Sequence, residues 1–378
     1  RDKHSAADTS SPTTQPTASP TRAPTEAPAT QVCPFTQPVQ VLLRDRGYSV
    51  SELDFKSGSY TERFLLPFSM TSPPYQRINA VSIHPVDKFM YGCLYTGGSE
   101  TYFVRVDVNS FTKVWYIGFS VTWINNGDFD SSGNFIYGYA NKMYSLKGFS
   151  SLSGYLDHSD SNIPDFSSEY AFITLPQSFG FADVVCIQKD LEGPSVGLQD
   201  YVFSISDDKI LVVRLGSSPT SWGLKAVQPA GSSHALGGGW GAGWKFGKHV
   251  FFAHNSGNGV FEIDVSAVDF ENKQVLVKKV GSSDPSGNND GMYCPGVEVP
   301  FPTCGRKDPT GSYGDGPVTD QDCAYAGVET RYNVSSADVV CSASPCDVGS
   351  ANAADQNTCC VTEPKILICT QDNEEIQI

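Results

Sequence analysis

The chain has 378 residues, of which 39% are hydrophobic, 12% aromatic and 18% charged, and its formal net charge is −15. This aromatic content suffices for a folded core, whereas the negative charge repels phosphate backbones and argues against nucleic-acid binding. No run of 18 apolar residues occurs, so no membrane-spanning helix is expected. Because the chain starts at Arg1, we expect a secreted protein whose signal has been removed.

Residues 1–32 contain no aromatic residue and no Leu, Ile or Met, so they cannot bury enough apolar area to fold alone. Proline recurs every fourth residue from Pro12 to Pro28, and threonine follows the first four prolines. This composition favours an extended polyproline-II tail and O-glycosylation. The predicted glycosylated residues are Thr13, Thr14, Thr17, Thr21 and Thr25.

The tail is long relative to a folded domain. At about 3.1 Å per residue it spans on the order of 100 Å, against a diameter of roughly 45–50 Å for a domain of this size. We therefore expect it to lie along a neighbouring subunit. A flexible stalk, and packing against its own domain, are the alternatives.

Residues 33–294 are rich in short strand-like runs separated by Gly, Asn, Asp and Ser turns. A degenerate repeat of a strand ending at an Asp or Gly turn occurs five times, and a polar hairpin precedes three copies. Two hairpins per repeat are typical of a four-stranded blade, so we predict an all-β fold, a β-propeller of five to seven blades. Six blades are favoured because residues 149–182 could hold one more. The copies are Tyr48–Asp54, Tyr102–Asp107, Met143–Gly148, Ile210–Gly216 and Val260–Asp264.

Eight of the 11 cysteines lie between Cys294 and Cys369, at irregular spacings and with no histidine beyond His254. This pattern favours disulfides over a zinc site and indicates an oxidising, extracellular setting. Cys93 and Cys186 lie in apolar strand-like runs and are expected to be the unpaired thiols. The predicted bonded cysteines are Cys33, Cys294, Cys304, Cys323, Cys341, Cys346, Cys359, Cys360 and Cys369, with a Cys33–Cys294 bond across the seam of the propeller.

Residues 295–378 are expected to form a separate Cys-rich module stapled by disulfides, because small secreted modules have few core residues. The sequon Asn333-Val334-Ser335 predicts N-glycosylation at Asn333. Residues 365–369 are strand-like, and the last residues, 374–378, could continue that strand or add to a neighbour's sheet edge.

Three segments resemble an uncharacterised family of secreted propeller domains: residues 80–92, the run Gly127-Asp-Phe-Asp-Ser-Ser-Gly-Asn134, and Asn288-Asn-Asp-Gly-Met-Tyr-Cys294. The resemblance covers about residues 33–294 and implies a propeller without assigned catalytic residues. The Pro-Thr tetrads separately resemble those of extracellular glycoprotein fibrils, which implies a surface or appendage subunit.

Several residues allow two interpretations. Asp128-x-Asp130-x-Ser132 resembles the start of a calcium loop, but Tyr139 occupies the twelfth position, which favours a hairpin turn. The recurrence of Asp54, Asp107 and Asp264 likewise indicates a repeated turn rather than an active site.

The histidine, glycine and tryptophan candidates also have structural interpretations. His249 and His254 are five residues apart and therefore on opposite faces of a strand, which argues against a metal pair. The glycine run 237–243 indicates crowding near the propeller axis, with a ligand-binding rim as the alternative. Trp240 and Trp244 are expected in the core rather than stacked on sugars. We therefore expect no catalytic residue, metal or cofactor.

The favoured hypothesis is an extracellular structural glycoprotein, a homopolymeric filament or appendage subunit that carries covalent glycans. The alternatives are a carbohydrate- or ligand-binding propeller on a stalk and a secreted hydrolase. The hydrolase would require convergent acids with raised pKa values, or a calcium ion, on the propeller axis.

Overall fold

The computed structural model describes the propeller region and parts of the C-terminal module. The predicted tail, with all its glycosylation sites, lies outside the described residues, as does the connection 148–170. The described residues are 33–67, 75–96, 100–107, 110–117, 124–147, 171–175, 179–180, 182–287, 289–298, 300–304, 317–324, 330–333, 340–341, 346–349, 353, 355–362, 367–369 and 375–377.

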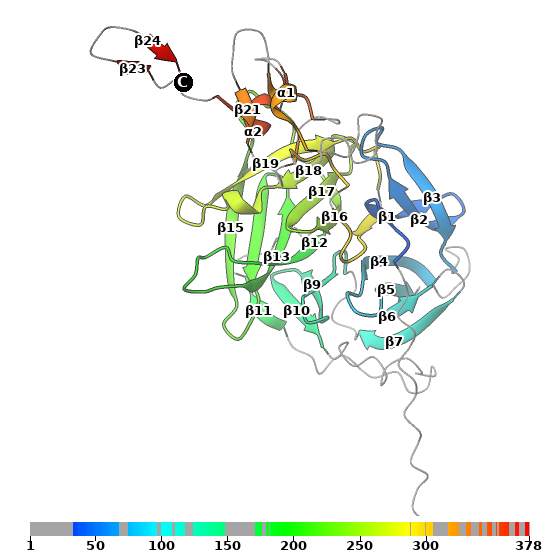
Figure 1. The fold of residues 1–378 in the computed structure, drawn as a ribbon. Coiled ribbons are helices and arrows are strands. Elements are labelled where there is room, and N and C mark those ends of the chain that lie inside the picture. Colours follow the sequence, from blue (N-terminus) through cyan, green and yellow to red (C-terminus); the bar gives the residue numbers. More distant parts are fainter. Residues whose placement is uncertain are drawn as a thin grey trace, which may run out of the picture.

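The described strands form a β-propeller, which confirms the predicted fold class (Figure 1). Blades 1 to 3 are separate four-stranded sheets, and blades 4 and 5 join into one eight-stranded sheet because β15 pairs in parallel with β19. Blade 1 contains β20 (Asn289–Met292), β1 (Val39–Arg44), β2 (Gly47–Leu53) and β3 (Tyr60–Leu65), and blade 2 contains β4 (Tyr75–Ile83), β5 (Met90–Thr96), β6 (Thr101–Val106) and β7 (Phe111–Ile117). Blade 3 contains β8 (Asp128–Phe129), β9 (Phe135–Tyr139), β10 (Lys142–Leu146) and β11 (Ala171–Thr174). Blade 4 contains β12 (Val184–Lys189), β13 (Gln199–Ser206), β14 (Lys209–Arg214) and β15 (Thr220–Val227), and blade 5 contains β16 (Trp240–Phe246), β17 (His249–His254), β18 (Gly259–Ile263), the short 3-10 helix η3 (Val265–Ala267) and β19 (Gln274–Gly281).

The ring closes with five blades, so the preference for six was wrong. The inner strands contact one another in a closed cycle, from β20 through β4, β8, β12 and β16 back to β20. Five apolar clusters fill the five interfaces between neighbouring blades. The strand within the region proposed for a sixth blade, β11, pairs with β10 and completes blade 3.

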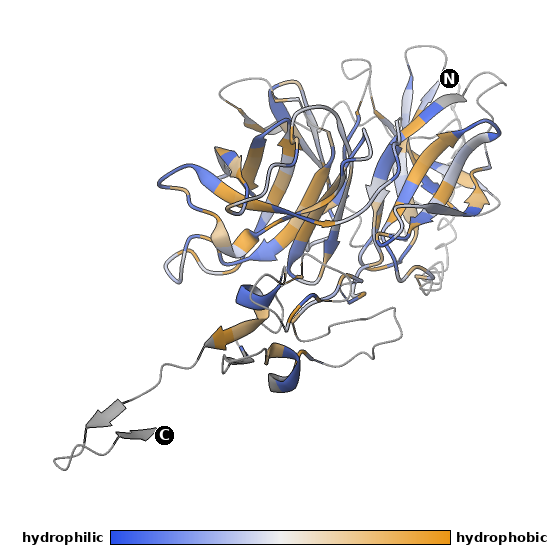
Figure 2. Cartoon of the chain, turned by 90° about the horizontal axis from the view of Figure 1, so that it is seen from above, coloured by the Kyte–Doolittle hydropathy of each residue, from blue (hydrophilic) through white to orange (hydrophobic). Residues whose placement is uncertain are grey.

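The middle strands of each blade are covered on both faces by neighbouring blades, so their sequences are continuous apolar runs rather than alternating ones. Every residue of β5 and β17 is buried. The outer strand β3 instead has three consecutive exposed residues. The hydropathy view shows the apolar runs inside the blades (Figure 2).

The two ends of the propeller sequence close the ring in blade 1. The last strand, β20, pairs antiparallel with the first, β1, with Val39 opposite Met292. The expected Cys33–Cys294 disulfide flanks this pair, with the two Cα atoms 5.7 Å apart. The seam is thus held by hydrogen bonds and by a covalent bond.

The described part of the module beyond the propeller has little regular structure. Throughout the described residues, no helix has the length and apolar character that crossing a membrane requires. Its core is a cluster of buried half-cystines with Val318. Strands β23 and β24 pair antiparallel with each other, so the last residues do not continue the 365–369 strand as one alternative expected. The elements are α1 (Asp320–Cys323), β21 (Thr330–Tyr332), α2 (Gln356–Cys359), β22 (Cys360–Thr362), β23 (Leu367–Cys369) and β24 (Glu375–Gln377).

Candidate functional site

Three aspartates from different blades lie at the propeller axis. Asp128 begins β8, Asp183 immediately precedes β12, and Asp290 is the second residue of β20, so all three belong to the inner ends of blades. Their side chains are at most 2% exposed. We call them the axial aspartates.

The carboxylates of Asp128 and Asp290 each bind the inner strand of another blade. Asp128 Oδ2 accepts the Cys186 N–H of blade 4 at 2.7 Å, and its Oδ1 accepts the Ser82 hydroxyl of blade 2 at 2.6 Å. Asp290 Oδ2 accepts the Val81 N–H of blade 2 at 2.6 Å. Each bond therefore joins two blades.

Asp183 joins three blades through one carboxylate. Its Oδ2 accepts the Gly243 N–H of blade 5 at 2.6 Å and the Gly291 N–H of blade 1 at 3.1 Å. Its Oδ1 accepts the Val184 N–H of its own blade at 2.7 Å. The axial aspartates thus accept backbone N–H groups from the inner strands of blades 1, 2, 4 and 5.

Asp183 and Asp290 are hydrogen-bonded to each other through their side chains. Two buried carboxyl groups in contact favour a shared proton, because two negative charges there would repel. Burial raises the pKa of Asp183 to about 7. Burial, and then the adjacent Asp183 carboxylate, raise the pKa of Asp290 well above its usual range. The structure therefore places paired carboxylates with raised pKa values on the axis, as the hydrolase hypothesis required.

The axis itself is crowded. A Cβ atom on Gly291 would lie 2.4 Å from the Gly243 carbonyl oxygen, and one on Gly241 would lie 1.9 Å from Asn289 Oδ1. Only glycine fits where the backbone comes this close to another backbone segment or to a side chain. The crowding predicted for the glycine run 237–243 is therefore confirmed at Gly241 and Gly243, whereas residues 237–239 are exposed and a Cβ atom on Gly237 would meet nothing within 4 Å.

The two aspartates of the calcium-like motif have different roles. Asp130 forms the predicted hairpin turn, because its Oδ1 accepts the backbone N–H groups of Ser132 and Asn134 at 2.9 and 2.8 Å. Asp128 does not belong to the turn and points to the axis instead, so the interpretation of both as turn residues was wrong for Asp128. The strand β8 that separates them has only two residues, too few for a sequence pattern to reveal.

The recurring aspartates are turn residues, as predicted. Asp54 Oδ1 accepts the Lys56 N–H at 2.9 Å, Asp107 Oδ1 the Ser110 N–H at 2.7 Å, and Asp264 Oδ1 the Ser266 N–H at 3.0 Å. Each bond closes a short turn after the third strand of a blade.

The aromatic and histidine candidates belong to the core. Trp244 is 0% exposed and donates its indole N–H to the Val39 carbonyl at 2.8 Å, and Trp240 is also buried. His249 contacts Glu262 at 2.6 Å, whereas His254 contacts the Gly237 carbonyl at 3.1 Å. The two histidines therefore face different partners.

Four disulfides are present in the described residues, and three of them staple the module: Cys304–Cys359, Cys323–Cys360 and Cys341–Cys346. Cys93 and Cys186 are free and buried, as predicted. Burial raises the pKa of both thiols well above the usual range. The side chain of Cys369 lies outside the described ones, so its pairing stays a prediction, as does glycosylation of Asn333.

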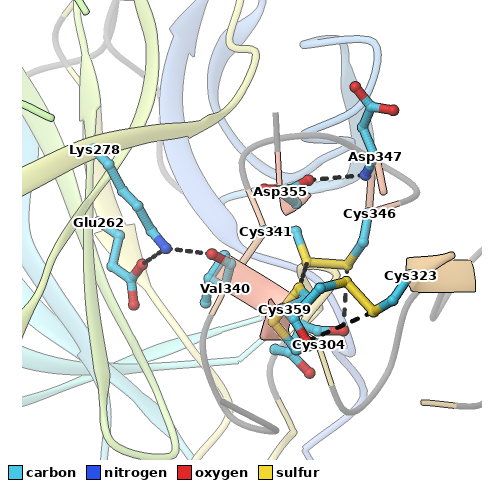
Figure 3. Close-up of a disulfide and its surroundings, with 12 residues drawn as sticks. Glu262, Lys278, Cys304, Cys323, Val340, Cys341, Cys346, Asp347, Asp355 and Cys359 are labelled. Atoms are coloured by element: carbon cyan, nitrogen blue, oxygen red, sulfur yellow. Dashed lines mark hydrogen bonds and ion pairs between the residues drawn. A yellow bond between two sulfur atoms is a disulfide. The ribbon is translucent and has the colours of Figure 1, made fainter. Parts of the chain in front are cut away.

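Among the described residues, three cysteine sulfurs lie within 4.8 Å of one another, close enough to hold a metal ion: those of Cys304, Cys341 and Cys359. All three sulfurs are engaged in disulfides, which removes the thiolates that a metal would need (Figure 3). Cys341 Sγ lies 3.7 Å from Cys359 Sγ, so two disulfides pack directly against each other. The three sulfurs are therefore close together because two disulfides are packed against each other, and not because they form a metal site.

The module is fixed to the interface between blades 5 and 1, a contact that the sequence did not reveal. Phe301 is 0% exposed and its ring lies 4.3 Å from Phe55 of blade 1 and 4.4 Å from Phe251 of blade 5. The Lys278 ammonium lies 3.3 Å from Glu262 and also donates to the Val340 carbonyl of the module (Figure 3).

Comparisons with known proteins give only a distant structural likeness. No protein-family model matches the chain, and no curated protein matches it. Among solved structures, a chain of a crystal structure of a nidogen/laminin complex aligns with a TM-score of 0.32 at 10% identity, covering 64% of this chain and 98% of that one.

Proposed function

We propose that the chain is an extracellular structural glycoprotein whose propeller serves as a rigid, non-catalytic subunit of a filament or surface appendage. The observation that carries the proposal is the double fixation of the propeller at blade 1. The Cys33–Cys294 bond closes the ring in blade 1, and Phe301 fastens the module to the interface between blade 1 and blade 5. A ring closed in this way resists the separation of its blades.

The disulfides support an extracellular location, because such bonds persist in oxidising compartments. The Pro-Thr tetrads of the tail support glycosylation and an extended tail that reaches a neighbouring subunit. The resemblance of residues 33–294 to secreted propeller domains agrees with this proposal and is kept as part of it.

Electron microscopy and light scattering of the native protein, compared with a variant that lacks residues 1–32, test the proposal. Filaments with a regular repeat are expected from the full chain, and shorter or no filaments from the truncated one. Monodisperse particles near the 40.8 kDa chain mass plus glycan, at all concentrations, would refute the proposal. Unchanged filaments after truncation would refute only the role of the tail.

A secreted hydrolase is the second candidate, and the raised pKa of the Asp183–Asp290 pair favours it. Against it, Asp183 and Asp290 are 0% and 1% exposed, and both accept backbone N–H groups. A panel of chromogenic glycosides, esters and lactones tests this candidate. Turnover that disappears in Asp183→Asn, with the fold retained by circular dichroism, would establish the hydrolase and displace the structural proposal.

A further inference from the structure

A groove of about 410 Å³ lies between blades 3 and 4. Its floor includes Leu211 of β14 and Gly223 of β15, which are directly opposite each other. A Cβ atom on Gly223 would meet nothing within 4 Å, so the face is hollowed there. Leu175 and Phe179, which follow the last strand of blade 3, also line the groove. The groove therefore has an apolar floor.

Three exposed lysines rim this groove, and we call it the lysine groove. Lys209 and Lys225 are directly opposite on β14 and β15, and the Lys225 N–H bonds to the Lys273 carbonyl at 2.9 Å. Like charges placed opposite each other destabilise a sheet. In the described part of the chain no carboxylate lies within 4.0 Å of these three ammonium groups, although Asp208 also lines the groove. An anionic partner would remove this repulsion.

The chain itself carries a suitable anion. Residues 295–378 contain 13 Asp and Glu but four Lys and Arg, a net charge of −9 out of −15 for the whole chain. The tail of residues 1–32 contains three of each kind and is neutral. Charge complementarity therefore favours the Cys-rich module over the tail as the occupant of the lysine groove.

We propose that the lysine groove accepts the acidic Cys-rich module of a second copy of this chain. The module of the same chain is fixed at the interface of blades 5 and 1 (Figure 1). The groove lies two interfaces away, which is the largest separation that a ring of five blades allows. A contact between two different surfaces repeats head to tail and builds an open filament unless the rotation between subunits closes it into a ring. The inference rests on the proposed function and supplies the contact that the filament needs.

Sedimentation velocity over a range of protein concentrations tests this contact with full-length variants. Lys209→Glu/Lys225→Glu reverses the rim charge, and Gly223→Trp fills the groove. The control is Lys56→Glu/Lys147→Glu, which changes the net charge equally at exposed lysines outside the groove. Thermal unfolding confirms that each variant folds.

Wild-type protein is expected to associate, both groove variants to associate at least tenfold more weakly, and the control to match the wild type. Association that is equal in the groove variants and the wild type would overturn the inference and leave the proposed function intact. An equal loss in the control would also overturn it, because the effect would then be one of net charge. A wild-type protein that stays monomeric at every concentration would refute both this inference and the proposed function.

The identity of the occupant is tested by zero-length carbodiimide cross-linking of a mixture of ¹⁴N- and ¹⁵N-labelled protein. Mixed-isotope cross-links from Lys209, Lys225 or Lys273 to carboxylates of residues 295–378 are expected. Mixed-isotope links from these lysines to the propeller or tail of another copy, or links within one chain to residues 148–170, would overturn the assignment of the module.

Discussion

The shared proton of Asp183 and Asp290 predicts that the propeller becomes less stable as the pH rises. The folded state raises the pKa of Asp183 from 3.8 to about 7, so between these values it binds more protons than the unfolded state does. Stability is therefore fully present below about pH 4 and is lost as the pH rises through 7. For a shift of this size the loss is about 2.5 kcal/mol between pH 5 and pH 8. The raised pKa values of Asp290 and Asp128 act in the same direction.

Urea unfolding at a series of pH values, with the disulfides intact, measures this loss. The variant Asp290→Asn keeps a hydrogen-bond donor beside Asp183 and removes one of the two ionisable groups. We expect it to match the wild type within about 1 kcal/mol at pH 5 and to lose much less stability by pH 8. A wild-type unfolding free energy that is constant or rises between pH 5 and pH 8 would refute the shared-proton reasoning. So would an equally steep fall in the variant.

Three further predictions concern the seam, the axis and the free thiols. Cys33→Ser removes the bond that closes a loop of 261 residues and should lower the free energy of unfolding by about 4–5 kcal/mol, measured by urea unfolding without reductant. Gly291→Ala forces a Cβ atom against the backbone at the axis and should lower the thermal midpoint by several degrees, whereas Gly287→Ala, where a Cβ meets nothing within 4 Å, should leave it unchanged. Cys93 and Cys186 should resist iodoacetamide in the native protein and react after unfolding, and mass spectrometry that finds them labelled in native protein would contradict their burial.

The repeat in the sequence located one particular strand of every blade. The copies that begin at Tyr48, Tyr102, Met143, Ile210 and Val260 correspond to β2, β6, β10, β14 and β18, the third strand of each blade. These strands are buried on both faces and end at a turn, so their pattern is strong. The number of blades was nevertheless overestimated, because the long connection before β11 looked like room for another repeat.

The axial site was less accessible to sequence reasoning. Asp128 and Asp290 lie in motifs that the sequence made conspicuous, but their bonds reach residues 58 and 209 positions away. No local spacing encodes such contacts. Asp183 lies in no conspicuous motif at all, and Phe301 follows the last propeller strand in a segment that resembles a linker. Their roles arise only when the ring brings blades 1, 4 and 5 together.

The closure of the ring in blade 1 also determines how the chain would carry load. The tail ends where Cys33 begins the propeller, and the module starts just beyond Cys294, whose Cα atom lies 5.7 Å from that of Cys33. A pull between tail and module would pass through one covalent bond and bypass the blades. Tension between the two ends of one chain would thus leave the propeller unstrained, whereas tension between the module and the lysine groove would cross the blades.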